Sequence, residues 1–205
     1  MKILVFDTCL DKMYVTIAED KKILSSKIVT NKDNKYHSAF LISTIKDSMK
    51  EQNLTPQDLD AIGTNIGPGS FTGIRACTTV ARIMAQQLNI PAAGISSLEI
   101  LAKLNKTQIP TIVALDARKN CAYLHIDNKI KGAVELEKVE ELLQNNNYHL
   151  ITDDKLQEKL GGISYQQGNY QLGEILASLV YEQLQKRACK WQELKPLYIQ
   201  PPPMC

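Results

Sequence analysis

The chain has 205 residues, of which 44% are hydrophobic and 22% charged, and its formal net charge is +2. This balance is typical of a soluble globular protein and argues against direct nucleic-acid binding, because a surface that binds nucleic acid concentrates Lys and Arg. The apolar run after Lys2 is too short for a signal peptide, and no stretch approaches the roughly 20 apolar residues of a membrane span. We therefore expect a cytoplasmic protein without membrane attachment.

Cysteine usage points to the same compartment. The five cysteines are odd in number, scattered along the chain and without a C-x-x-C pair. Such a pattern argues against a disulfide framework and against a structural zinc site. A reducing cytoplasm fits this pattern.

Hydrophobic periodicity and turn residues predict alternating strands and helices. In the first half, the expected elements are a hairpin that opens with a strand over 3–7, a strand near 23–29, a polar connector over 30–35, a helix over 37–52, a strand over 59–65, a helix over 73–88, a strand over 92–95 and a helix over 96–104. In the second half, they are a hairpin over 111–127, a helix near 137–144, a strand at 148–152, a helix over 172–187 and a proline-rich tail at 201–203.

The chain also contains one internal repeat. Matching residues recur at an offset of 109: Asp7, Tyr14 and Ile17 correspond to Asp116, Tyr123 and Ile126. Each copy reads as an apolar strand, an Asp-containing turn and a second strand of alternating character. The pattern therefore predicts two lobes that each begin with a hairpin.

The most informative segment is the turn between the strand at 59–65 and the helix at 73–88. It reads N-I-G-P-G-S-F-T-G over residues 65–73 and continues with Ile74 and Arg75. The glycine spacing fits neither a P-loop, which needs a Gly-Lys-Ser/Thr ending, nor the G-x-G-x-x-G dinucleotide fingerprint. From composition alone the segment is a tight turn in which Ser70 or Thr72 caps the following helix and Gly73 permits a close approach.

Catalysis by this chain finds little support in its residues. The turns at 7–11 and 116–119 contain no glycine, so they offer no backbone cradle for phosphates. Ser70 is not in a G-x-S-x-G elbow, and no histidine lies near it in the sequence. We therefore expect no catalytic residues and no cofactor.

The glycine-rich segment resembles, closely, the signature of the TsaB (YeaZ) family of tRNA threonylcarbamoyladenosine biosynthesis proteins. That signature reads G-P-G-S-F-T-G, a hydrophobic residue and Arg, and here it comprises Gly67, Pro68, Gly69, Ser70, Phe71, Thr72, Gly73 and Arg75. We call these residues the signature loop. The resemblance extends to the D-L-D-A run before the loop, to N-I-P at 89–91, to S-S-L-E at 96–99 and to the strand at the amino terminus.

The resemblance implies a fold as well as a family. The fold is α/β, with two ribonuclease-H-like lobes of the actin-like ATPase (ASKHA) superfamily, in which mixed sheets are flanked by helices and the second lobe is reduced. We expect residues 1–104 to form the first lobe, which carries the partner-binding helices, and residues 105–205 the smaller second lobe.

The resemblance also implies a function. Members of this family act as the non-catalytic subunit of the complex that makes threonylcarbamoyladenosine at position 37 of tRNAs that read ANN codons. They support the catalytic subunit TsaD, with the ATPase TsaE as a third member, and contact tRNA only through the complex. TsaD holds its metal through an H-x-x-x-H pair, and because position 41 here is Leu rather than a partner for His37, we expect no metal.

In the family, the two helices of the first lobe pack against their equivalents in TsaD. That carry-over places a partner-binding surface on residues of the helices 37–52 and 73–88: Phe40, Leu41, Ile45, Gly73, Ile74, Cys77, Ala81 and Ala85. The same surface is expected to form a homodimer when the chain is alone. An autonomous actin-like phosphotransferase or ATPase is the alternative function, which the glycine-poor turns disfavour.

Overall fold

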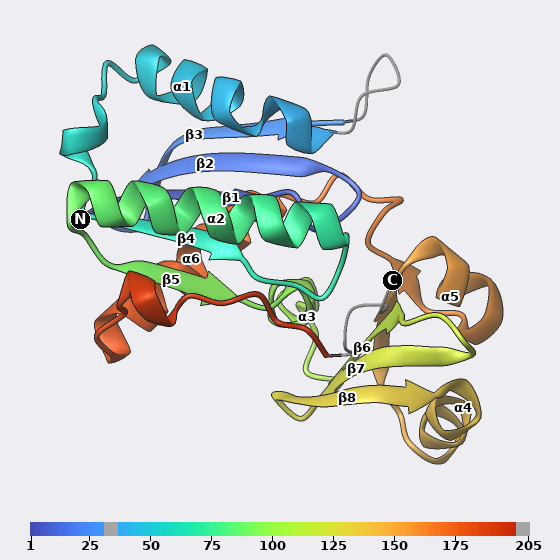
Figure 1. The fold of residues 1–205 in the computed structure, drawn as a ribbon. Helices are drawn as coiled ribbons and strands as arrows, with labels where there is room; N and C mark the ends of the chain where they lie inside the picture. The colour runs from blue at the N-terminus through green and yellow to red at the C-terminus, as the bar shows by residue number, and fades with distance from the viewer. Residues whose placement is uncertain (31–36, 200–205) are drawn as a thin grey trace, which may run out of the picture. The chain divides into compact units, whose positions relative to one another are not determined.

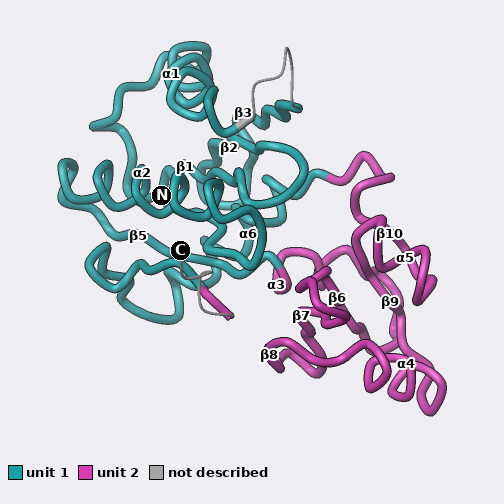
Figure 2. Tube along the Cα trace, turned by 45° about the vertical axis from the view of Figure 1, so that its right-hand side comes forward, with its two compact units in different colours: residues 1–97, 171–197 teal, residues 98–170, 198–205 magenta. Residues whose placement is uncertain are grey.

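The computed structural model describes residues 1–30 and 37–199. The chain divides into two compact units, which Figure 2 shows in different colours. Unit 1 comprises residues 1–97 and 171–197, and unit 2 comprises residues 98–170 and the segment that begins at 198. The proline-rich tail and most of the polar connector lie outside the described residues.

Unit 1 is built around a five-stranded mixed sheet in the order β3-β2-β1-β4-β5. Its strands are β1 (Lys2–Asp7), β2 (Met13–Glu19), β3 (Lys22–Val29), β4 (Ala61–Asn65) and β5 (Ala92–Ile95). Its helical segments are η1 (His37–Phe40), α1 (Leu41–Glu51), η2 (Pro56–Asp58), α2 (Phe71–Leu88), α6 (Leu172–Lys186) and η3 (Trp191–Glu193). β1 pairs antiparallel with β2 and parallel with β4.

Successive side chains of a strand point to opposite faces of the sheet, so this sheet has two apolar faces. Different helices cover the two faces. Leu4, Phe6 and Ile62 belong to the core cluster beneath α1 and α2. Gly63 lies on the other side, where a Cβ would overlap Val180 of α6. Figure 1 shows α2 in front of the sheet and α6 behind it.

The position of α6 corrects the expected division at residue 104. The final helix was expected in the second lobe, whereas it packs on β1, β2, β4 and β5 of unit 1. Its apolar residues Leu176, Ala177 and Val180 are buried there. The face of the sheet opposite α1 and α2 is apolar and must be covered by another element. α6, which follows unit 2 in the chain, provides that cover.

Unit 2 holds a second five-stranded sheet in the order β10-β9-β6-β7-β8. Its elements are β6 (Thr111–Asp116), β7 (Cys121–Ile126), β8 (Lys129–Glu135), α4 (Leu136–Asn145), β9 (His149–Thr152), α5 (Asp154–Leu160) and β10 (Ile163–Ser164). α3 (Ser97–Ala102) begins at the boundary between the two units. Val139 of α4 and Leu156 of α5 are buried in one cluster with the strands, so both helices cover the same face.

The predicted repeat is present in both sheets. β6-β7-β8 repeats the antiparallel meander β1-β2-β3, and each meander has a register shift in its second pair of strands. The pairing differs by one residue, because Tyr14 lies opposite Asp7 whereas Tyr123 lies opposite Leu115. Two mixed sheets flanked by helices confirm the expected fold class.

Candidate functional site

The signature loop connects β4 to α2. The Gly67–Pro68 peptide bond is cis, and Gly67 has a φ of 103°, a value that favours glycine. Ser70 is the N-cap of α2, and its Oγ accepts a hydrogen bond of 3.3 Å from the backbone N–H of Gly73. The predicted cap is therefore present, although α2 begins at Phe71 rather than at Gly73.

The loop packs against the turn that follows β1. Ser70 donates a backbone hydrogen bond of 2.8 Å to the carbonyl oxygen of Cys9. A Cβ on Gly69 would overlap that same carbonyl, and a Cβ on Gly73 would overlap the carbonyl oxygen of Thr8. The glycines thus allow two backbone segments to touch, and the space that a phosphate would need is filled by protein.

Asn65 at the end of β4 is the centre of a buried hydrogen-bond network. Its Nδ2 donates to Oδ2 of Asp7 at 3.0 Å, and its Oδ1 accepts from the N–H of Gly67 at 2.8 Å and from Oγ of Ser97 at 2.9 Å. Asn65 and Ser97 are fully buried. The network therefore ties the end of β1, the signature loop and the start of α3 together.

Asp7, which ends β1, is buried with its carboxylate inside this network. Oδ1 accepts a hydrogen bond of 2.6 Å from the backbone N–H of Cys9. Burial raises the pKa of Asp7 to about 6, against the opposing effect of the hydrogen bonds from Asn65 and Cys9. Because only 1% of Asp7 is exposed, a nucleotide in solvent does not reach its carboxylate.

The equivalent turn of unit 2 is held by an ion pair. Oδ2 of Asp116 lies 3.1 Å from Nζ of Lys155, and Oδ1 accepts from the N–H of Arg118 at 2.9 Å. Partial burial works to raise the pKa of Asp116, but these two donors outweigh it and the pKa lies below its usual value. Arg118, Lys119 and Asn120 all have positive φ angles.

The structure places seven of the eight expected partner-binding residues in the core of unit 1, which corrects that assignment. Those below 9% exposure are Leu41, Ile45, Gly73, Ile74, Cys77, Ala81 and Ala85, and Phe40 is half-buried against the same core. The small residues of α2 allow it to approach β4 and β5 of its own sheet. The carry-over from the family fails at these positions because small residues at helical spacing can face the protein's own sheet as well as a partner helix.

Large apolar side chains instead lie on the outer faces of these helices. Ile42 on α1 is 60% exposed, and Phe71 and Ile83 on α2 are 41% and 54% exposed. Arg75 stacks its guanidinium on the Phe71 ring at 3.8 Å. Phe71, Arg75, Thr79 and Ile83 follow at four-residue steps, so they form one exposed stripe along α2. We call these three exposed residues, Ile42 on α1 and Phe71 and Ile83 on α2, the outer apolar patch.

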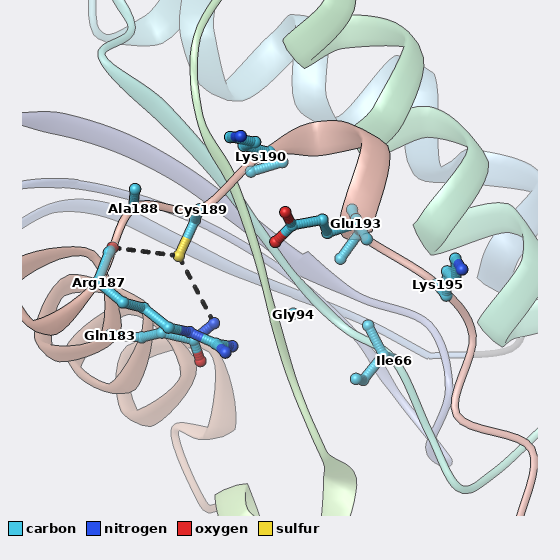
Figure 3. A pocket seen from close by; sticks show the side chains of 11 residues that line it. Ile66, Gly94, Gln183, Arg187, Ala188, Cys189, Lys190, Glu193 and Lys195 are labelled. Atoms are coloured by element: carbon cyan, nitrogen blue, oxygen red, sulfur yellow. Dashed lines mark hydrogen bonds between the residues drawn. The ribbon is translucent and has the colours of Figure 1, made fainter.

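A cavity of about 110 Å³ lies beside β5 and the end of α6. Ile66, Gly94, Arg187, Cys189 and Glu193 are among its lining residues. Lys190 and Lys195 line the cavity at separate points, and their amino groups do not point toward each other (Figure 3). Because ligand pockets usually hold roughly 300–1,000 Å³, this cavity is too small for a nucleotide.

In the described residues, no helix has both the length and the apolar character that crossing a bilayer requires.

Comparisons with known proteins agree with the motif. A family model described as TsaD, tRNA N6-adenosine threonylcarbamoyltransferase, matches residues 21–166. The tRNA threonylcarbamoyladenosine biosynthesis protein TsaB of Buchnera aphidicola subsp. Schizaphis graminum is 30% identical over 157 residues, which cover 69% of this chain and 72% of that protein. TsaB of Bacillus subtilis is 30% identical over 137 residues, which cover 66% of this chain and 58% of that protein.

Solved structures share the fold. The structure of YeaZ from Pseudomonas aeruginosa superposes with a TM-score of 0.75 over 97% of this chain and 100% of that chain, at 21% sequence identity. A second structure from the same organism, described as similar to peptidase YEAZ, gives a TM-score of 0.76 at 18% identity and covers 97% of this chain and 99% of that one. At these identities the likeness concerns the fold.

Proposed function

The chain belongs to the TsaB (YeaZ) family, and from this membership we propose that it is a non-catalytic subunit of the complex that makes threonylcarbamoyladenosine at position 37 of tRNAs reading ANN codons. Its partners are a TsaD-like catalytic subunit and a TsaE-like ATPase. It meets tRNA only through the complex, in the cytoplasm.

The observation that carries the non-catalytic role is the closed contact between the signature loop and the turn after β1. The backbone of Gly69 and Gly73 lies directly on Cys9 and Thr8, so the loop has no room for an anion. Asp7 is buried and bound by Asn65. The glycine-rich loop therefore serves the fold of this chain, and we expect the chain to act through contacts that its surface makes with partners.

The outer apolar patch is the surface that we assign to the TsaD-like partner. Scattered single apolar residues are ordinary on a protein surface, whereas two helices that cover one face and each expose a large aliphatic residue are suited to a helical interface. Ile42 and Ile83 are more exposed than any other large apolar residue of the described chain. The same patch would pair two copies of the chain when no partner is present, as a two-fold dimer.

Substitution of Ile83 by Arg tests this assignment. Ile83 is 54% exposed, so the variant is expected to fold with an unchanged melting temperature. Co-purification with the TsaD-like protein is expected to fall at least tenfold, since the charge must be desolvated at the interface. Light scattering of the variant alone is expected to show a monomer.

Ile130 on β8 of unit 2 provides the matched control, because it is 38% exposed and belongs to the same residue type. Ile130→Arg is expected to leave partner binding unchanged. Normal binding by Ile83→Arg, or an equal loss with Ile130→Arg, would contradict the assignment of the patch.

A further inference from the structure

Two cysteines that are far apart in the sequence meet under the signature loop. Cys9 follows β1, Cys77 lies in the second turn of α2, and the carboxylate of Asp7 is beside them. A carboxylate oxygen of Asp7 and both sulfur atoms lie within 4.8 Å of one another. All three residues are buried, with exposures of 2% or less.

The packing of α2 brings these donor atoms together. Gly73 lets the first turn of α2 touch the carbonyl oxygen of Thr8. Cys77 lies one turn further along the same face, where its Sγ accepts a hydrogen bond of 3.2 Å from the backbone N–H of Thr8. Cys9 Sγ donates to the carbonyl oxygen of Asn65 at 3.4 Å. The cluster is thus fixed by backbone contacts from three elements.

Charge at the cluster is unbalanced. Among the described residues, no Lys, Arg or His forms an ion pair with Asp7. Buried carboxylates in proteins are usually paired with a cation or coordinate a metal. The hydroxyl of the next residue in the chain, Thr8, is fully buried without a hydrogen-bond partner, and it lies against Gly73, on the same face of α2 as Cys77.

We propose that Asp7, Cys9 and Cys77 form a binding site for one Zn²⁺ ion, with two thiolates and one carboxylate as protein ligands. Zinc accepts this set of sulfur and oxygen donors. A metal-bound thiol loses its proton, so binding releases protons. The presence of the Asp7 carboxylate favours metal binding over a disulfide between Cys9 and Cys77, because a disulfide would leave the carboxylate without a role. The site is independent of the function proposed above.

Titration of the reduced, metal-free full-length chain with Co²⁺ tests the site. One equivalent is expected to produce the charge-transfer absorption of a cobalt–thiolate bond, and Zn²⁺ is expected to remove that absorption by competition. Zn²⁺ is also expected to raise the melting temperature of the chain. Cys9→Ala and Cys77→Ala are each expected to lose the absorption and to bind Zn²⁺ at least roughly tenfold more weakly.

Cys121 and Cys189 provide matched controls, because both are free cysteines outside the cluster. The double variant Cys121→Ser and Cys189→Ser is expected to keep the absorption and the rise in melting temperature. Melting curves of the metal-free Ala variants show whether they fold. The proposal is overturned if the wild type lacks the charge-transfer absorption, if a folded Cys9→Ala or Cys77→Ala variant keeps it, or if only the control variant loses it.

Discussion

The side-chain amide of Asn65 donates a hydrogen bond of 3.0 Å to Oδ2 of Asp7, and both residues are buried at the carboxyl ends of the adjacent parallel strands β4 and β1. The pair is the point where the signature loop, the first hairpin and the start of α3 are joined.

Asn65→Ala should destabilise the protein by about 3 kcal/mol, because it removes partners from Asp7, Gly67 and Ser97 inside a buried network. Urea denaturation followed by circular dichroism measures the loss. Ser97→Ala removes one hydroxyl from the same network and should cost about 1 kcal/mol. A loss for Asn65→Ala no larger than that for Ser97→Ala would show that Asn65 does not hold the network together.

Gly73→Ala should destabilise the protein by about 2 kcal/mol, because its Cβ would overlap the carbonyl oxygen of Thr8 and push α2 away from the turn after β1. The adjacent Thr72 is exposed, so Thr72→Ala is the control and should change stability by less than about 0.5 kcal/mol. Chemical denaturation of the two variants beside the wild type gives the comparison. Equal stability of all three would remove the argument for a tight contact at Gly73.

Local sequence patterns were sufficient for much of the fold. The helix cap expected at Ser70 or Thr72 is present at Ser70, and the repeated hairpins and the strand before the signature loop are present too, since each depends on residues close together in the chain. The sheet against which α6 packs was not predictable in this way. The apolar stripe of this helix is compatible with either sheet, and only the uncovered back face of the first sheet decides between them.

The cluster of Asp7, Cys9 and Cys77 could not be predicted from local sequence patterns either. Cys9 and Cys77 are far apart in the sequence, so no motif spacing connects them. Their sulfur atoms come together only because α2 packs closely against the end of β1. Likewise, the small residues of α2 have helical spacing that suits a partner or a sheet equally. Burial separates the two cases, and burial is a property of the folded chain.

Ala81→Arg therefore has a different expected outcome from a surface substitution on the same helix. Ala81 is fully buried, so the guanidinium would enter the core and should unfold the chain or prevent its expression in soluble form. Thr79 is exposed two residues earlier, and Thr79→Arg should keep a native melting curve. Thermal melting with circular dichroism distinguishes them, and a well-folded Ala81→Arg protein would contradict the packing of α2 on its own sheet.

Isothermal titration calorimetry with Mg-ATP should show binding no tighter than about 1 mM, because the signature loop and the turn after β1 fill each other's space. A coupled assay of phosphate release should show no turnover by the isolated chain. Micromolar binding together with steady hydrolysis would instead favour the autonomous phosphotransferase or ATPase.

Lowering the pH should weaken the fold of unit 2 through His125. This histidine on β7 is 4% exposed, and its Nδ1 is buried without a hydrogen-bond partner. Burial lowers the pKa of His125 below the ordinary value of 6.5, and the nearby Glu99 and Asp127 oppose that shift only in part. The unfolded chain therefore takes up a proton at a higher pH than the folded chain does.

The sign of the effect follows from proton uptake. Where the unfolded state binds more protons, stability rises with pH. The contribution of His125 is complete above the unfolded pKa of 6.5 and is lost as the pH falls from there toward the folded pKa. Urea denaturation between about pH 7.5 and about pH 5 should give a smaller loss for His125→Phe than for the wild type, because all other titrating groups are shared. An imidazole resonance of His125 that titrates at or above 6.5, or identical pH profiles for the two proteins, would contradict this origin of the pH dependence.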